Sequence, residues 1–497
     1  MTSSLKRARP FSNDVVVTIV LVSFVLVTAA FGNNPVPTVV VPTIPQAVVP
    51  GSGAFTLKVY GANFVSGAVV NWNGQARTTT FVSARELQAQ ILASDIVKPT
   101  AGYITVTNPP PGGGVSSASY AIVEVHEPTK TISVKQPTTY PNNPGYVITA
   151  DFTGDGILDL VTGSDDAYGP VSLNVGNGDG TFQSAITIGS DYFPLAGMGF
   201  GDFNGEGKLD IAYGWQDSKS GFCAFGGNPP CYVEVLVNKG HEKFHGLHPF
   251  GSYGETVAAS IVAGDFNNDG MLDLAVFEGD EVGEIFLGNG DGTFTHKQTI
   301  HFGQVNGFGA VTADFNGDGE LDLVAAYGNS LYLMLGNGDG TFQKPRRIVS
   351  DRHQIDCGLV VNDFNGDGIP DLAFCDEHLS GGASAARLGI LLGNGDGTFR
   401  GPVYYWPGAP YGGSFAAGDF NSDGKTDLIF SGAILSHGYK PVFCVLWGNG
   451  DGTFQKPKKI ALPDDSSGSF VPGDFNSDGL LDFVMVVSYG LAAYIQQ

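Results

Sequence analysis

The sequence has few charged side chains and very few basic ones. Of its 497 residues 15% are charged, and 25 lysines and arginines stand against 49 aspartates and glutamates. Nucleic acid is not expected as a partner, because no basic patch is present to neutralise phosphates. The chain also lacks a long amphipathic helical pattern, a P-loop, a dinucleotide motif and an ordered Ser/His/Asp set. These absences favour many short strands joined by tight turns, and they supply no recognisable catalytic machinery.

Long apolar runs are absent except for one near the N-terminus. Lys6, Arg7 and Arg9 precede an apolar stretch from Val15 to Ala30, which ends in small residues. This layout is typical of a secretory signal. The stretch is short for a membrane span, and a retained anchor is the alternative. Residues 1–32 are therefore predicted to be a signal peptide or N-terminal anchor of a monomeric, secreted or cell-envelope protein, extracellular or periplasmic, with no other membrane contact.

Cysteine is scarce, which fits an exported protein with few disulfides. Of five cysteines, Cys223 and Cys231 are close together in a predicted loop and are predicted to form a disulfide. Cys357 and Cys375 lie on either side of a repeated acidic segment and could also pair. Cys444 is left over.

Glycine, in contrast, is abundant at 72 residues, and much of it belongs to a repeat. One copy reads Asp-Phe-Asn-Gly-Asp-Gly-Glu-Leu-Asp-Leu from Asp314 to Leu323. Seven copies open with Asp-Phe and carry an acid at position 5, Gly at position 6 and Asp at position 9. They begin at Asp151, Asp202, Asp265, Asp314, Asp363, Asp419 and Asp474. This regular spacing indicates a repeat architecture.

The spacing within each copy predicts a calcium loop. Side-chain oxygens at positions 1, 3, 5 and 9, a carbonyl at position 7 and a glycine turn at position 6 are how a short loop wraps a hard cation. The pattern overlaps the first half of an EF-hand loop, but a β-type run follows it in place of a helix. Metal-free Asx turns are the alternative, although three carboxylates in one loop would repel each other without a cation. We expect the loops to be exposed and to hold up to seven calcium ions.

The predicted ligands are Asp151, Thr153, Asp155, Ile157 and Asp159; Asp202, Asn204, Glu206, Lys208 and Asp210; Asp265, Asn267, Asp269, Met271 and Asp273; Asp314, Asn316, Asp318, Glu320 and Asp322; Asp363, Asn365, Asp367, Ile369 and Asp371; Asp419, Asn421, Asp423, Lys425 and Asp427; and Asp474, Asn476, Asp478, Leu480 and Asp482. The first loop, with Thr153 in place of Asn, and the second, with Glu206 in place of Asp, depart from the pattern. These two loops match the pattern of a calcium site least well.

A second motif follows most loops after two apolar strands. It reads Leu-Gly-Asn-Gly-Asp-Gly-Thr-Phe at residues 287–294, 335–342 and 392–399, with close variants at 175–182 and 447–454. Asn-Gly and Asp-Gly between apolar runs predict tight hairpins. Each repeat then has four strands, as in a propeller blade. After Asp482 too few residues remain for a full blade, so a segment near residues 131–135 is predicted to supply its outer strand.

These paired motifs resemble the FG-GAP (VCBS-type) repeats of β-propellers, the fold of integrin alpha subunits. The resemblance covers residues 126–497 and implies an all-β fold with a seven-bladed propeller. Residues 33–125 are predicted to form a small β-sandwich: residues 33–50 are a Pro- and Val-rich extended lead-in, and residues 51–124 alternate with period two. That part resembles an IPT/TIG immunoglobulin-like domain, through Gly61-Ala62-Asn63-Phe64 and Val70-Asn71-Trp72-Asn73-Gly74. Such sandwiches host many unrelated functions, and a spacer role is the simplest expectation.

The second repeat also contains His241-Glu242-Lys243-Phe244-His245, a formal match to a zinc-protease motif. That motif works only on a helix, whereas here it aligns with a predicted hairpin. Exposed turn histidines are the expectation, with adventitious metal binding as the alternative.

The expected function is non-enzymatic recognition of an extracellular glycan or protein. Variable loops gather on the face opposite the calcium loops, and such loops tend to carry function. Resemblance to integrin alpha subunits supports this face. Candidate ligand-binding aromatics there are Tyr168, Tyr192, Trp215, Trp406 and Tyr411. A polysaccharide-cleaving enzyme is one alternative, for which Glu377 and His378 are the candidate acid–imidazole pair. A purely structural cell-surface module is the other.

Overall fold

The computed structural model describes most of the chain after residue 32. The described residues are 33–497 except for 117–120, 136, 141–143, 165–168, 190–194, 217–230, 254–257, 279–280, 304–306, 352–353, 356–357, 381–382, 409–410, 435–439, 461, 463–468 and 488–489. The predicted signal or anchor at residues 1–32 therefore lies outside them. In the described part of the chain, none of the helical segments has the length and apolar character of a membrane span.

Two sheets build the N-terminal module. One has the order β1 (Thr38–Ile44), β3 (Phe55–Ala62), β7 (Glu86–Ile91) and β6 (Thr79–Ser83). The other has the order β2 (Ala47–Val48), β10 (Ala121–Val125), β8 (Thr100–Asn108), β4 (Val69–Trp72) and β5 (Gln75–Ala76), with β9 (Gly114–Val115) beside β8. A 3-10 turn, η1, spans Ala93–Ile96.

Alternation along these strands explains the sandwich. Along β8, Ile104 and Val106 are buried while Thr105 and Thr107 turn outward. The inward side chains of both sheets form one apolar cluster around Trp72, whose indole lies where a side chain at Gly102 would be. We call this module the sandwich; its assignment to the IPT/TIG family stays a prediction.

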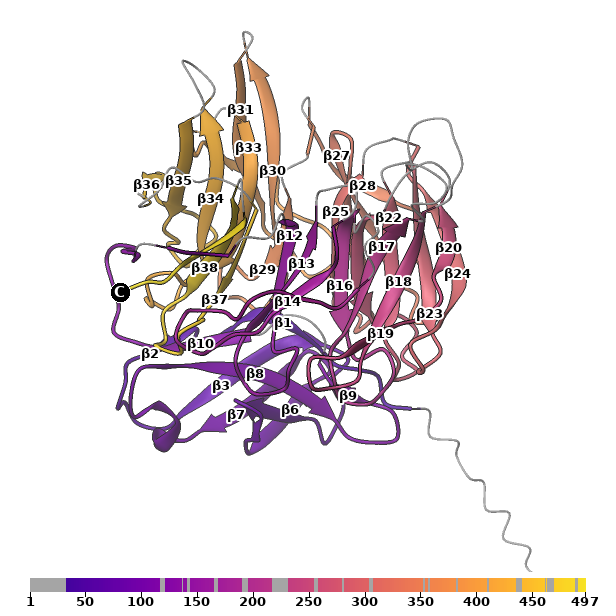
Figure 1. Cartoon of the computed structure of the whole chain (residues 1–497), viewed down its shortest axis with the longest axis horizontal. Coiled ribbons are helices and arrows are strands. Elements are labelled where there is room, and N and C mark those ends of the chain that lie inside the picture. Colours follow the sequence, from indigo (N-terminus) through magenta and orange to yellow (C-terminus); the bar gives the residue numbers. More distant parts are fainter. Residues whose placement is uncertain are drawn as a thin grey trace, which may run out of the picture. The chain divides into compact units, whose positions relative to one another are not determined.

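The strands after the sandwich form antiparallel sheets, seven in the described residues, which follow one another in chain order (Figure 1). Their strands are β12 (Pro144–Ala150), β13 (Asp159–Ser164), β14 (Ser172–Asn174) and β15 (Ile186–Thr187); β16 (Leu195–Gly201), β17 (Asp210–Gln216), β18 (Cys231–Asn238), β19 (Phe244–Gly246) and β20 (Phe250–Tyr253); β21 (Ala258–Gly264), β22 (Asp273–Glu278), β23 (Val282–Gly288) and β24 (Phe294–His301); β25 (Gly307–Ala313), β26 (Asp322–Tyr327), β27 (Ser330–Met334) and β28 (Arg346–Ser350); β29 (Leu359–Asn362), β30 (Asp371–Ser380), β31 (Ala383–Leu391) and β32 (Val403–Tyr405); β33 (Tyr411–Gly418), β34 (Asp427–Ile434), β35 (Lys440–Leu446) and β36 (Lys458–Lys459); and β37 (Phe470–Gly473), β38 (Asp482–Val487) and β39 (Gly490–Tyr494) with β11 (Thr138–Tyr140).

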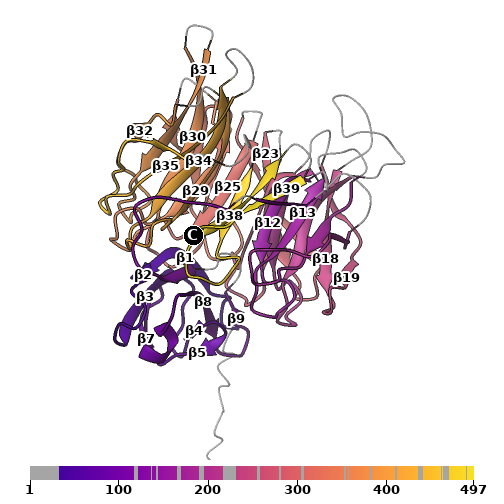
Figure 2. The ribbon, with the colours of Figure 1, turned by 60° about the vertical axis from the view of Figure 1, so that its left-hand side comes forward.

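Apolar side chains between successive sheets join them into a closed β-propeller. One core cluster combines Leu160 and Val147 of the first sheet with Val484 and Leu491 of the last, so the two ends of the ring meet. Figure 2 shows β12 and β13 beside β38 and β39. The prediction of an all-β propeller is confirmed. The inner strands are apolar on both faces because each sheet is packed between two neighbours.

The last sheet takes its fourth strand from the segment before the first repeated loop. Thr138–Tyr140 pairs antiparallel with Leu491–Ala493. The predicted closing segment, residues 131–135, contributes an isolated bridge from Val134 to Gln496. The regular strand therefore begins a few residues after the position expected from the sequence. This pairing covers an edge of the last sheet that would otherwise be open.

Candidate functional site

Each repeated loop joins the first two strands of a sheet, and its ninth residue anchors it. Asp273 is fully buried; its Oδ2 accepts a hydrogen bond from Phe266 N at 2.8 Å and its Oδ1 accepts one from Gly288 N at 2.9 Å. Gly288 begins the Gly-rich hairpin, so this aspartate holds the loop and the hairpin at the same end of the blade. The corresponding aspartates are all fully buried: Asp159, Asp210, Asp322, Asp371, Asp427 and Asp482. The expectation that the loops are exposed is wrong at this position.

The first residue of each loop organises the turn around itself. Asp314 accepts hydrogen bonds from Gly317 N at 2.7 Å and Gly319 N at 2.9 Å. Asn316 and Asp318 are joined by a hydrogen bond from Asn316 Nδ2 to Asp318 Oδ2 at 2.8 Å. Oxygen atoms from positions 1, 3 and 5 are thereby drawn into one tight loop.

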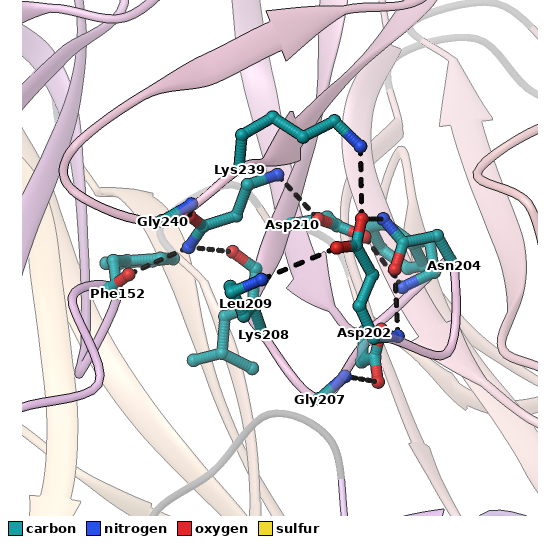
Figure 3. Close-up of polar contacts among 12 residues, drawn as sticks. Phe152, Asp202, Asn204, Gly207, Lys208, Leu209, Asp210, Lys239 and Gly240 are labelled. Atoms are coloured by element: carbon teal, nitrogen blue, oxygen red, sulfur yellow. Dashed lines mark hydrogen bonds and ion pairs between the residues drawn. The ribbon is translucent and has the colours of Figure 1, made fainter.

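The second loop differs in its charge balance (Figure 3). Glu206 accepts hydrogen bonds from Lys239 Nζ at 3.0 Å and Lys208 Nζ at 3.4 Å, and the hydrogen bond from Lys239 leads in lowering the pKa of the Glu206 carboxyl. Asn204 Nδ2 also donates to Glu206 Oε1 at 2.8 Å. Two lysines therefore supply positive charge that a bound cation would supply in the other loops.

The donor set fits a hard divalent cation. Burial, together with repulsion from neighbouring loop carboxylates, raises the pKa of Asp273 to about 8 and that of Asp427 to about 9. Such groups are stabilised as anions by a cation held among them. In the first loop, the buried Thr153 Oγ1 has no hydrogen-bond partner within the protein. Across the described residues, no group of three or more His, Cys, Asp or Glu side chains is arranged to hold a metal alone. Asparagine, threonine and main-chain oxygens would therefore have to complete each site, as calcium coordination permits.

The sandwich packs on this end of the propeller and contacts the loops. Val36 N donates to Asp265 Oδ2 at 2.8 Å, Arg85 Nε lies 3.1 Å from Asp314 Oδ2, and Tyr103 OH donates to Asp474 O at 2.8 Å. The sandwich also hydrogen-bonds to the sixth loop, through Ser422 Oγ donating to Glu124 Oε2. In these loops and the fifth, the first aspartate is at most 4% exposed: Asp265, Asp314, Asp363, Asp419 and Asp474. We call these five the covered loops.

The first and second loops are instead open. Asp151 and Asp202 are partly exposed and line a cavity of about 820 Å³ between these loops and the sandwich. On the sandwich side the cavity is lined by β4, β8, β9 and their connecting residues, and on the propeller side by loop residues and by apolar groups beneath them. We call this space the junction cleft. Its lining includes Asn71, Asn73, Tyr103, Thr105, Thr107, Val115, Ser116, Phe152, Thr153, Asp155, Phe200, Lys208 and Leu209.

Only one of the predicted ligand-binding aromatics has a described side chain. Trp406 follows β32 and is 49% exposed. Tyr168 and Tyr192 lie outside the described residues; Trp215 and Tyr411 lie in β17 and β33, but their side chains are outside the description. The side chains of Glu377 and His378, in β30, are likewise outside it.

Beside Trp406 is a polar network that the sequence did not reveal. The Arg387 guanidinium carbon lies 3.9 Å from the centre of the Tyr404 ring and 5.7 Å from that of Trp406. Arg387 also bonds to the buried Asp376 and, at 2.6 Å, to Asp351 Oδ2, which accepts a further hydrogen bond from Tyr404 OH at 2.7 Å. The pairing of β30 with β31 could have suggested one contact of this network, because it places Asp376 opposite Arg387. The contact with Asp351 could not be foreseen in this way, because Asp351 directly follows β28 of the preceding sheet.

The remaining sequence features are placed as follows. His241 and Glu242 have positive φ and form the turn between β18 and β19, so they are not on a helix. Cys375 is buried and disulfide-bonded, while Cys357 lies outside the described residues. The predicted Cys223–Cys231 disulfide also falls outside the description. Cys444 is free and buried.

A family model described as the FG-GAP-like repeat matches five stretches of the chain, at residues 151–213, 265–325, 314–374, 376–430 and 435–485. Together these cover more than half of the sequence. A search of the curated proteins found no match to the sequence.

Several solved structures match the chain at low sequence identity. A lectin from Agrocybe aegerita, described as recognising non-reducing terminal N-acetylglucosamine, is 19% identical, with 79% of this chain and 96% of that chain covered and a TM-score of 0.48. An auxiliary nutrient binding protein from Bacteroides ovatus is 12% identical, with 93% and 98% covered and a TM-score of 0.39. The Dos1 propeller is 11% identical, with 73% and 95% covered and a TM-score of 0.46. At these identities the likeness is one of fold alone.

Proposed function

Because the chain belongs to the FG-GAP-like repeat family, we propose that it is an exported, calcium-stabilised and non-enzymatic recognition protein that binds an extracellular glycan or another protein. The observation that carries the recognition role is the half-exposed ring of Trp406, held in place by a buried polar network. The calcium role rests on the oxygen-rich loops. The two roles are separable, since they involve opposite ends of the blades.

Calcium would be held by positions 1, 3, 5 and 9 of the loops, with the carbonyl at position 7. Bound there, the ion would supply positive charge to carboxylates that are otherwise gathered in a poorly solvated place. The chain itself has already shaped each loop, because backbone N–H groups orient the first aspartate and the buried ninth aspartate fixes the loop on the hairpin. Such preorganisation lowers the ordering cost of binding.

Trp406 is suited to recognition because its ring is both exposed and restrained. The Arg387 guanidinium sits over Tyr404 and near Trp406, and Asp376 and Asp351 fix that guanidinium. A restrained aromatic ring loses little conformational entropy when a ligand stacks on it. Aromatic residues with a polar surround are also typical anchors of protein interfaces, which is why both ligand classes belong to the proposal.

The test is binding of a panel of hexasaccharides to the full protein in millimolar calcium, measured by titration calorimetry. The panel holds neutral gluco-, manno-, xylo- and N-acetylchito-hexasaccharides and an acidic galacturonan hexasaccharide. The Trp406→Ala variant is expected to weaken binding of the best hexasaccharide about tenfold or more, since loss of a stacked aromatic costs on the order of 1–3 kcal/mol. Val403→Ala is the control, because Val403 is also 50% exposed and lies in β32, three residues before Trp406.

Two results would count against this proposal. Unchanged binding in Trp406→Ala would remove Trp406 from the recognition surface. Shortening of any hexasaccharide during the titration would replace recognition by the polysaccharide-cleaving alternative.

A further inference from the structure

We propose that the junction cleft is itself a binding site for a neutral oligosaccharide. This inference rests on the proposed recognition function and adds a second place and a ligand class to it. The observations are the cavity of about 820 Å³, its position between the sandwich and two loops of the propeller, and the chemistry of its two walls. Sites of this size, roughly 300–1,000 Å³, at the junction of two modules are typical of small-ligand binding.

The sandwich wall of the cleft is a row of amide and hydroxyl groups. Asn71 on β4 lies opposite Thr105 on β8, and its Nδ2 donates to Thr105 Oγ1 at 3.2 Å and to Thr107 Oγ1 at 3.0 Å. Alternation along β8 places Thr105 and Thr107 on the outer face while Ile104 and Val106 enter the core. These groups are therefore held at fixed spacing on a rigid sheet, with both donor and acceptor capacity.

Tyr103 extends the same row with an aromatic ring. Its hydroxyl donates to Asp474 O at 2.8 Å, which ties the side chain to the seventh loop. The ring lines the cleft, and it precedes Thr105 by two residues on the same face of β8. A fixed ring beside hydroxyl and amide groups matches a sugar, which presents apolar C–H faces and hydroxyl edges together.

The propeller wall determines the charge of the ligand. Asp151, Asp155 and Asp202 line it, with Lys208 as the basic residue of the lining. Without ions, these carboxylates repel uronic acids and other anions, because like charges at close range repel each other. With an ion in each of the two loops the wall would be close to neutral, so it would still offer an anion no net attraction. The chain as a whole carries a formal net charge of −24, which acts in the same direction. A neutral sugar meets no such penalty.

The contrast with the covered loops shows that this cleft is more than imperfect packing. The sandwich brings a main-chain or side-chain group onto the third, fourth, sixth and seventh loops. Over the first two loops it instead turns its hydroxyl-rich face, and the first aspartates stay partly exposed. A concave space of this size suits an extended chain of sugars.

The experiment uses the same hexasaccharide panel with full-length variants in millimolar calcium. It follows the binding step that Trp406→Ala leaves unchanged, because Trp406 does not line the cleft. Thr105→Val combined with Thr107→Val removes two hydroxyls without changing side-chain shape, and binding of the preferred neutral hexasaccharide should weaken about tenfold. Val115→Trp fills the cleft from β9 without removing a polar group, since Val115 is 49% exposed, and should abolish that binding. Thr80→Val, on the exposed face of β6 outside the cleft lining, is the control and should bind as the unmodified protein does.

The outcomes separate this inference from the proposed function. If a neutral hexasaccharide binds and neither Thr105→Val/Thr107→Val nor Val115→Trp weakens it, the cleft is not the site, while glycan recognition stands and Trp406 remains its candidate. If the galacturonan hexasaccharide binds best, the assigned ligand class is wrong. If no hexasaccharide binds the unmodified protein, glycan recognition itself fails, and the inference fails with it.

Discussion

The five covered loops and the two open loops share one sequence pattern but have different surroundings. In the covered loops the first aspartate is at most 4% exposed, and the sandwich supplies neighbours such as Val36 N and the Arg85 guanidinium. In the open loops Asp151 and Asp202 face the junction cleft. The open loops are also the two whose sequences depart from the pattern, through Thr153 and Glu206.

This difference separates two uses of one motif. A loop whose carboxylates are buried under another module can contribute to stability, because an ion bound there binds the folded protein and not the unfolded chain. A loop that opens on a cleft can contribute to recognition, since its groups are accessible to a ligand. If the two groups of loops have these roles, the sandwich would be more than a spacer, because its contacts would decide which loops are covered and which stay open.

Removal of calcium should have the largest effect, and most of it should come from the covered loops. We expect a chelator to lower the Tm of the unmodified protein by about 10 °C or more, since each site filled at 100 times its Kd contributes about 2.7 kcal/mol. Asp265→Asn with Asp474→Asn should lose a large part of this calcium-dependent shift. Asp151→Asn with Asp202→Asn, the matched pair in the open loops, should retain most of it.

Thermal unfolding of the three proteins, with calcium and with chelator, measures the difference. Equal losses in the two double variants would show that cover by the sandwich does not matter for stabilisation by calcium. The absence of any chelator effect in the unmodified protein would instead favour turns held without ions.

A pair of glycines offers a smaller and more local test of the same comparison. Gly156 and Gly479 occupy the sixth position of the first and seventh loops, with φ of +86° and +89°. A side chain at Gly156 would meet nothing within 4 Å, whereas one at Gly479 would lie 2.6 Å from Thr100 O and 2.8 Å from Val125 O of the sandwich. Gly156→Ala should cost about 1–2 kcal/mol from backbone strain alone. Gly479→Ala should cost about 1–3 kcal/mol more, because the sandwich must move.

Urea unfolding in saturating calcium gives both free energies of unfolding. Equal costs would mean that the sandwich is not seated on the seventh loop. A larger cost at Gly156 would reverse the comparison.

The sequence was sufficient for the repeating part of the fold and insufficient for the contacts between modules. The oxygen donors of each loop lie within nine consecutive residues, and the Asn-Gly and Asp-Gly pairs of the hairpin indicate its turn. Local spacing was therefore enough to predict both. The ninth aspartate also joins loop to hairpin, as in Asp273 with Gly288, but its burial follows from the blade packing and was missed. The assignment of the loops to calcium stays a prediction.

Long-range partners have no local signature. Arg85 and Asp314 are 229 positions apart, and nothing in the alternation of the sandwich strands tells which outer face meets the propeller. The network of Arg387 with Asp351 joins two successive blades, so it depends on packing between sheets. The closing strand was expected near residues 131–135 because the last blade lacks residues, but its register is set by its partner Leu491–Ala493, far along the chain, and composition does not encode that pairing.

Replacement of Arg85 is expected to have the smallest effect. It tests whether the Arg85 guanidinium stabilises the Asp314 carboxylate when no cation is bound. Its guanidinium is 3.1 Å from Asp314 Oδ2, and the side chain is 28% exposed while that of Asp314 is 1% exposed. In chelator, Arg85→Met should cost about 1 kcal/mol, because a partly exposed ion pair is lost beside a buried carboxylate. In saturating calcium the cost should fall towards zero, because Arg85 and the ion compete for the same negative charge.

Arg77→Met is the control. Arg77 pairs with Asp95 inside the sandwich at 2.9 Å, far from any loop ligand in sequence, so the cost of Arg77→Met should be the same with and without calcium. Urea unfolding of both variants with and without calcium measures this, and a calcium-independent cost for Arg85→Met would mean that the fourth loop holds no ion beside Asp314.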